Sequence, residues 1–196
     1  PPLPYRLNGK LIFPVGNLTG WWNHNELRTA IKYGCEIKRI YKTIFSKDTV
    51  NYFKNYIDKV KTEDLLQELK NSQAITHELM LSITPEMENY AYEKGKWTLK
   101  EVLRHINDAE RIFAYRALRL SRLDATPLAG FDENSYIENT KELQPSMQEI
   151  TAEFQAIRES SILLFSQMSD KMLDFEGIAN NSSITARAIG YILVGH

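Results

Sequence analysis

The sequence has little of several features that define large classes of protein. It holds a single cysteine, Cys35, among 196 residues, which excludes an intramolecular disulfide framework and a CxxC metal site. No apolar run approaches the roughly 18 residues that a membrane span needs, and the start shows no signal peptide. The formal net charge is −1, so the chain as a whole has no polybasic excess for nucleic acid. We therefore expect a cytoplasmic protein with no membrane partner.

Charge and proline are distributed unevenly along the chain. Residues 1–60 hold ten basic and four acidic side chains, whereas residues 61–196 hold 14 basic and 21 acidic ones. Four of the seven prolines lie within the first 14 residues. Such asymmetry indicates two parts with different partners or origins. We predict two domains, residues 1–60 and residues 61–196.

The first part has a mixed α/β pattern. Tyr5–Leu7 and Lys10–Phe13 flank Asn8-Gly9, and Asn-Gly favours the type I′ turn of a β-hairpin. The remaining pattern predicts a helix that ends near Tyr33, a strand over residues 35–45 and a helix after Asp48. We therefore expect a small α/β fragment before residue 61.

The second part is predicted to be helical throughout. Capping boxes at Thr98–Glu101 and Ser146–Glu149 mark the starts of two long helices. Apolar spacing predicts four helices in all, over residues 65–83, 98–123, 146–168 and 184–196. With no strand pattern between them, they indicate a four-helix bundle. The long connection over residues 124–145 is either functional or poorly ordered.

Two histidines border the apolar stripes of predicted helices. His105 neighbours Ala109 and Ile112, and His196 follows Ile192 at helical spacing. If both imidazoles point into the bundle, they form a metal-ligating pair of the kind that suits zinc. Alternatively they are two unrelated boundary histidines, because a catalytic zinc normally takes three protein ligands. His77 is interpreted as a surface residue.

Charged side chains near these histidines also allow two interpretations. Glu101 or Asp108 could fix the tautomer of His105, or they could form ordinary pairs along the helix surface. Three arginines could form a basic edge that receives an anionic substrate, or they could be solvated or paired with glutamate. They are Arg116, Arg119 and Arg122.

Three segments of the second part resemble the DinB superfamily. They are GKWTLKEVLRHINDAERIFAYRALRLSR over residues 95–122, TPLAGFDEN over residues 126–134 and ARAIGYILVGH over residues 186–196. Their order and spacing make the whole of residues 61–196 similar to that family. The resemblance implies a four-helix bundle in which three histidines hold a divalent metal between the helices.

The resemblance assigns two of the three family ligands. The first family histidine matches His105 and the second matches His196. The third normally lies four residues beyond the second, so we expect the DinB-like domain to be C-terminally truncated and its activity to be impaired. The family implies a divalent metal, expected to be zinc. It also implies a transferase or hydrolase that acts on a small-molecule substrate, with a low-molecular-weight thiol as a candidate cosubstrate.

The first part resembles a different family. LPYRLNGKLIFPVGNLTGWWNHNELRTAIKYG over residues 3–34 and FKNYIDKV over residues 53–60 are similar to a palm-region segment of the protein-primed family B DNA polymerases of linear plasmids. The metal-binding aspartate motifs of that family are not found in this sequence. No polymerase residue is therefore carried over, and we interpret the chain as an in-frame chimera of two fragments.

Three functions follow from these patterns. The first is a truncated, metal-dependent DinB-like enzyme domain, for which the sequence also allows a homodimer. The second is a non-catalytic chimeric fragment with a vestigial site, and the third is a DNA-binding remnant of a polymerase. Metal content separates the first from the second. Salt-dependent DNA binding tests the third, and we expect any nucleic acid to bind only through residues 1–60.

Overall fold

The computed structural model describes residues 5–7, 10–12, 56, 60 and 64–196. The chain divides into two compact units, Pro1–Glu36 and Ile37–His196. The helix predicted to end near Tyr33 and the strand predicted over residues 35–45 lie outside the described residues. The helix predicted after Asp48 also lies outside them, except for the helical Tyr56. The domain boundary at residues 60–61 stays a prediction.

The N-terminal hairpin is described. Strand β1 (Tyr5–Leu7) pairs antiparallel with β2 (Lys10–Ile12), and Leu7 lies opposite Lys10. This register leaves Asn8-Gly9 between the two strands in the sequence, as the turn preference of that dipeptide predicts. The hairpin prediction is confirmed for the described residues.

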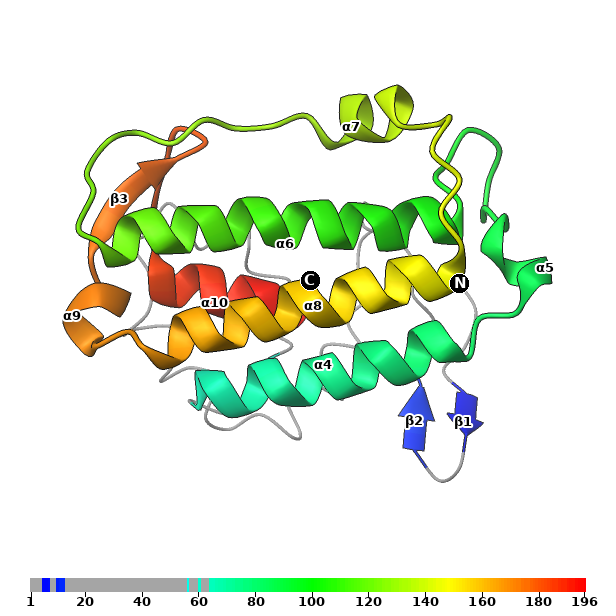
Figure 1. The fold of residues 1–196 in the computed structure, drawn as a ribbon, viewed down its shortest axis with the longest axis horizontal. Coiled ribbons are helices and arrows are strands. Elements are labelled where there is room, and N and C mark those ends of the chain that lie inside the picture. The colour runs from blue at the N-terminus through cyan, green and yellow to red at the C-terminus, as the bar shows by residue number, and fades with distance from the viewer. Residues whose placement is uncertain (1–4, 8–9, 13–55, 57–59, 61–63) are drawn as a thin grey trace, which may run out of the picture. The chain divides into compact units, whose positions relative to one another are not determined.

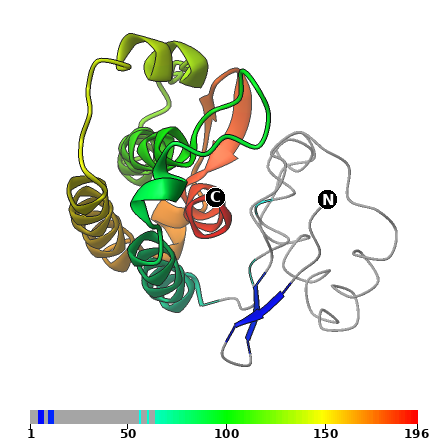
Figure 2. The same cartoon turned by 90° about the vertical axis from the view of Figure 1, so that its right-hand side faces the viewer.

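Four long helices form the bundle, which confirms the predicted mainly helical fold. They are α4 (Leu65–Leu81), α6 (Leu99–Ser121), α8 (Met147–Ser166) and α10 (Ala186–Gly195). Helix α4 packs against α8, α8 against α6, α6 against α10, and α10 against α4. The packing therefore closes on itself around one core (Figures 1 and 2). No helix of the described residues is long and apolar enough to span a membrane.

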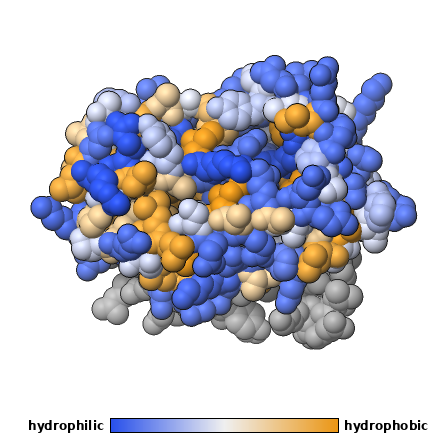
Figure 3. Space-filling model, viewed as in Figure 1, coloured by the Kyte–Doolittle hydropathy of each residue, from blue (hydrophilic) through white to orange (hydrophobic). Residues whose placement is uncertain are grey.

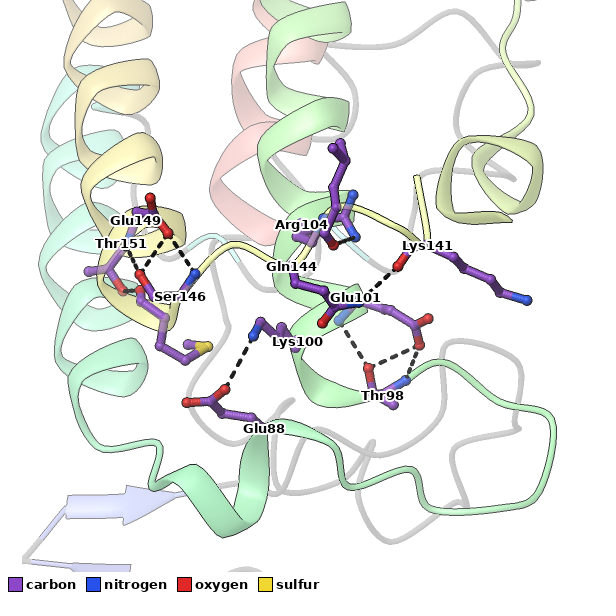
Figure 4. Close-up of polar contacts among 12 residues, drawn as sticks. Glu88, Thr98, Lys100, Glu101, Arg104, Lys141, Gln144, Ser146, Glu149 and Thr151 are labelled. Atoms are coloured by element: carbon purple, nitrogen blue, oxygen red, sulfur yellow. Dashed lines mark hydrogen bonds and ion pairs between the residues drawn. The ribbon is translucent and has the colours of Figure 1, made fainter. Parts of the chain in front are cut away.

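Capping side chains define where α6 and α8 begin. The Thr98 hydroxyl accepts a hydrogen bond from the Glu101 N–H at 3.2 Å, and the Glu101 carboxylate accepts one from the Thr98 N–H at 2.7 Å. Ser146 and Glu149 form the same reciprocal pair at 3.2 and 2.7 Å (Figure 4). Both predicted capping boxes are confirmed, because they satisfy N–H groups that a helix start leaves without intrahelical partners.

The core has a larger and a smaller cluster of buried apolar side chains. The larger one includes Val60, which is only 2% exposed, so the core takes in a residue before the bundle's first helix. The bundle helices contribute most of this cluster, including Leu69, Phe113, Leu120, Ile162, Phe165, Ile189 and Ile192. The smaller cluster consists of Met80, Leu103, Met147, Ile150 and Phe154.

A second hairpin precedes the last helix, where the sequence indicated no strands. Strand β3 (Glu176–Ala179) pairs antiparallel with β4 (Ser182–Thr185). Asn180 and Asn181 connect the strands with φ values of 50° and 61°, a conformation that asparagine tolerates better than most residues. The prediction of a helix from Ile184 is corrected: α10 begins at Ala186, because the Thr185 hydroxyl caps it by accepting the Ala188 N–H.

The connection between α6 and α8 is built into the fold. It contains the short helix α7 (Glu133–Asn139), whose start is capped by Asp132. Two backbone hydrogen bonds join Leu128 to the β3–β4 hairpin, from the Leu128 N–H to the Ile178 carbonyl at 2.9 Å and from the Asn180 N–H to the Leu128 carbonyl at 3.0 Å. Two further short helices, α5 (Pro85–Glu88) and α9 (Asp170–Leu173), complete the helices of the described residues.

Candidate metal centre

The two histidines singled out from the sequence lie side by side. His105 lies in the first half of α6, and His196 is the residue at which α10 ends. Their ring centroids are 5.2 Å apart, and the ring planes are inclined by 67°. Two Zn–N bonds of about 2.0–2.1 Å limit a shared pair of nitrogens to a separation of roughly 4 Å. The packing of α10 against α6 thus brings the two imidazole rings into contact.

Each histidine ring also contacts an aromatic ring. The ring of Trp97 lies 5.0 Å from that of His105, and the ring of Tyr56 lies 5.2 Å from that of His196, both centroid to centroid. Trp97 directly precedes Thr98, the N-cap of α6, and so comes to the site with the start of that helix. Each imidazole therefore has one aromatic ring packed beside it.

Neither aromatic residue was predicted from the sequence as part of the site. Trp97 belongs to a segment that resembles the DinB superfamily, and its place next to a helix cap was the one available signal. Tyr56 had no signal, because its contact with His196 depends on the tertiary structure.

Burial controls the protonation of His105. Burial lowers the pKa of this imidazole, and the negative charges of Glu133 and Asp108 oppose the shift. Glu133 is the first residue of α7, so the connection over residues 124–145 contributes to the electrostatics of the site. Burial likewise raises the pKa of the Asp108 carboxyl. A lowered pKa favours the neutral form of His105, and only neutral imidazole ligates a metal.

The acids considered as partners of His105 do not hydrogen-bond to it. Glu101 is engaged by its capping box with Thr98. Within the described part of the chain, Asp108 acts on His105 through charge alone, and the imidazole of His105 makes no hydrogen bond. Neither ring nitrogen is therefore hydrogen-bonded to another described residue.

The described residues provide two imidazoles and no third group beside them. Among residues 64–196 and the few described before them, no cluster of three His, Cys, Asp or Glu side chains could hold a metal. His77 is half-buried on α4 and does not join the pair. The donor set fits a borderline metal in kind, but it is one ligand short of the three that a catalytic zinc normally takes.

The three arginines considered as a basic edge, Arg116, Arg119 and Arg122, have different partners. Arg116 is buried, donates a hydrogen bond to the Ala129 carbonyl at 2.8 Å and stacks on Phe113 and Phe131. Arg119 pairs with Asp124. Arg122, the C-cap of α6, donates to the Ser121 hydroxyl at 2.9 Å. For Arg119, the arrangement fits the interpretation of a paired side chain.

A groove lies between α6 and α8, on the face shown in Figure 3. It is a shallow groove with a volume of about 360 Å³. Its lining mixes small, polar and apolar side chains: Arg111, Ala114, Ala156, Ile157, Ser160 and Ser161. Because it contains no histidine, it is separate from the pair formed by His105 and His196.

Comparison with known proteins places both parts of the chain. A family model described as the DinB superfamily matches residues 68–196, and one described as DNA polymerase type B, organellar and viral, matches residues 1–71. Both resemblances noted in the sequence are thereby confirmed. No curated protein matches the chain.

One solved structure has the same fold. It is described as "YfiT from Bacillus subtilis is a probable metal-dependent hydrolase with an unusual four-helix bundle topology". The match has a TM-score of 0.59 and 20% sequence identity, and it covers 69% of this chain and 79% of the other. At that identity the likeness establishes the bundle fold.

Proposed function

The chain belongs to the DinB superfamily, and on that premise we propose that its helical bundle is a metal-dependent enzyme domain in which His105 and His196 bind one divalent ion. The single observation that carries this proposal is the contact between the two imidazole rings, 5.2 Å apart between centroids. The rings belong to residues 91 positions apart in the sequence, and they are the two residues that match the family's ligands.

The chain's own residues prepare this site in three ways. Burial lowers the pKa of His105 and so favours the neutral form, which ligates zinc and similar borderline metals. Trp97 and Tyr56 pack against the two imidazoles. Glu133 provides a negative charge near His105, which favours a cation. A bound divalent metal would supply Lewis-acid polarisation of a substrate or a thiol.

Hydrolysis and thiol-dependent group transfer are the two reaction classes that we propose for a small-molecule substrate. The first is supported by the bundle's likeness to a probable metal-dependent hydrolase, and the second by the family resemblance of the sequence. Zinc is the metal that two imidazoles favour most simply. The described residues bring two imidazoles together but no cluster of three metal-ligating side chains, so we expect them to hold a metal weakly.

Isothermal titration with zinc tests the proposal. We expect weak binding by the chain, a further loss in His105→Ala and His196→Ala, and no change in the control His77→Ala. Appending one helical turn with a histidine four residues after His196 should raise the affinity, because the two histidines would then lie on one helix face. Binding that is unaffected by His105→Ala, or no binding even by the extended chain, would contradict the proposal.

A non-catalytic chimeric fragment is the second candidate. It is favoured by the absence of a third metal-ligating side chain beside the pair within the described residues. The match of residues 1–71 to a DNA polymerase family and the basic character of residues 1–60 favour a DNA-binding remnant as a variant of it. If DNA binds and its affinity falls steeply with salt while zinc does not bind at all, this candidate replaces the enzyme.

A further inference from the structure

A buried ion pair lies in the middle of the bundle. Arg158 of α8 and Glu110 of α6 have side chains that are 4% and 2% exposed. The guanidinium donates two parallel hydrogen bonds, from Nε to Oε1 of Glu110 at 2.7 Å and from Nη2 to Oε2 at 2.9 Å. Bidentate pairing of this kind fixes the relative position of the two side chains and therefore of the helices that carry them.

The remaining donors of Arg158 reach the other two helices. Nη2 also donates to the Leu193 carbonyl of α10 at 3.1 Å. Nη1 donates to the Ser72 hydroxyl and, at 3.5 Å, to the Leu69 carbonyl, both on α4. The guanidinium also lies over the ring of Phe154, 5.3 Å from its centroid. One side chain of α8 is thus hydrogen-bonded to the other three helices of the bundle.

The bond to Leu193 has a particular consequence for α10. Leu193 lies on α10, three residues before His196. Arg158 donates to the Leu193 carbonyl from α8. It therefore ties this part of α10 to α8, close to His196.

The same guanidinium also fixes α6 near the other histidine. Its partner Glu110 lies five residues after His105 on a continuous helix. A helix is rigid over a few residues, so His105 keeps its position relative to Glu110, and His196 keeps its position relative to Leu193. A shift of α10 along α6 would therefore move His196 relative to His105. A buried ion pair is seldom more stabilising than an apolar pair of similar volume, so stability alone does not account for this arrangement.

We propose that Arg158 is a positioning residue: through Glu110 and the Leu193 carbonyl it sets how α10 lies along α6, and thereby holds the imidazoles of His105 and His196 at the separation that one metal ion requires. The proposal rests on the function proposed above. Lysine cannot replace arginine in this role, because its single ammonium group lacks the planar fork that bonds Glu110 and Leu193 together.

Three variants separate positioning from stability. The double variant Glu110→Leu/Arg158→Met replaces the ion pair with apolar side chains and should stay folded. Arg158→Lys keeps the positive charge, and it replaces the double variant in the measurements if that variant does not fold. Ile150→Ala is the control, because it removes a fully buried side chain from the smaller core cluster, away from α10.

Two measurements decide the proposal. In the metal-free protein, the nuclear Overhauser effect between the ring protons of His105 and His196 should weaken in both Arg158 variants and persist in Ile150→Ala. Zinc affinity, measured by competition with a chromophoric chelator, should fall about tenfold or more in the Arg158 variants, as for other residues that orient metal ligands. It should change little in the control.

The outcomes distinguish this proposal from the proposed function. If the unmodified chain binds no zinc, the metal function fails, and the ring-to-ring effect alone decides whether Arg158 positions the histidines. If zinc binds and neither measurement differs between the Arg158 variants and the unmodified chain, the positioning role is wrong. A loss of equal size in Ile150→Ala would also overturn it, since general destabilisation would then explain the effect.

Discussion

At the scale of single residues, the contact between His105 and His196 depends on close packing at the end of α10. A Cβ atom at Gly195 would lie 1.9 Å from the carbonyl oxygen of Tyr56, so only glycine permits this approach. The neighbouring His196 then meets the Tyr56 ring on one side and the His105 ring on another. A residue without a side chain thus allows the site's aromatic wall to form.

Gly195→Ala should destabilise the protein by about 1–3 kcal/mol, the usual cost of forcing an extra group into a packed site. The clash is with backbone, which no side-chain rotation relieves, and it outweighs the gain in helix propensity of roughly 1 kcal/mol. Urea denaturation measures the change. Gly190→Ala is the comparison, because its new Cβ would meet the side-chain end of Leu65 and should cost less. A Gly195→Ala protein as stable as the original would contradict the close approach.

Asp124 provides a pH-dependent contribution to stability. Its hydrogen bond from the Arg119 guanidinium holds the pKa of this carboxyl well below its usual range. The folded protein therefore binds fewer protons than the unfolded chain, and the contribution is present above the ordinary pKa near 3.8 and lost as the pH falls below it.

In Asp124→Asn, the free energy of unfolding should fall less steeply from pH 5 to pH 3, because this carboxyl no longer titrates. Urea denaturation across that range measures the slope. Glu142→Gln is the control, since Glu142 makes no hydrogen bond or ion pair with the described residues. Equal slopes for the original and Asp124→Asn proteins would show that the pair contributes nothing.

Elements differ in how far the sequence alone defines them. The starts of α6 and α8 were predictable, because a capping box is a local pattern of residues three positions apart. The β3–β4 hairpin was not, since four-residue strands on either side of Asn180-Asn181 carry little periodicity. The pairing of Arg158 with Glu110 was also missed, because the partners lie 48 residues apart and meet only once α6 and α8 pack.

Thr98→Ala should lower stability by about 1 kcal/mol, the typical value of an N-cap side chain. The change removes the hydroxyl that accepts the Glu101 N–H at the start of α6, the helix that carries His105. Thermal and urea unfolding give the difference. Ser169→Ala is the matched control, because Ser169 precedes α9 without making a side-chain cap. Equal losses in both variants would show that the cap of α6 is not responsible.

The whole molecule combines segments that match two families. The order of its helices and their resemblance to one family were enough to predict the bundle. They also assigned His105 and His196 as a candidate pair, although their proximity requires α10 to pack on α6. The aromatic neighbours and the bonds of Arg158 depend on that packing and could not be read from local sequence. The central claim is that the pair, once assembled, binds one metal ion.

X-ray absorption spectroscopy of the zinc-loaded chain tests this claim most directly, because it counts the imidazoles around the ion. We predict two imidazole nitrogens at about 2.0–2.1 Å from zinc, one in His105→Ala, and two in the control His77→Ala. An unchanged number of imidazoles in His105→Ala, or a spectrum without imidazole ligands in the original chain, would contradict the account.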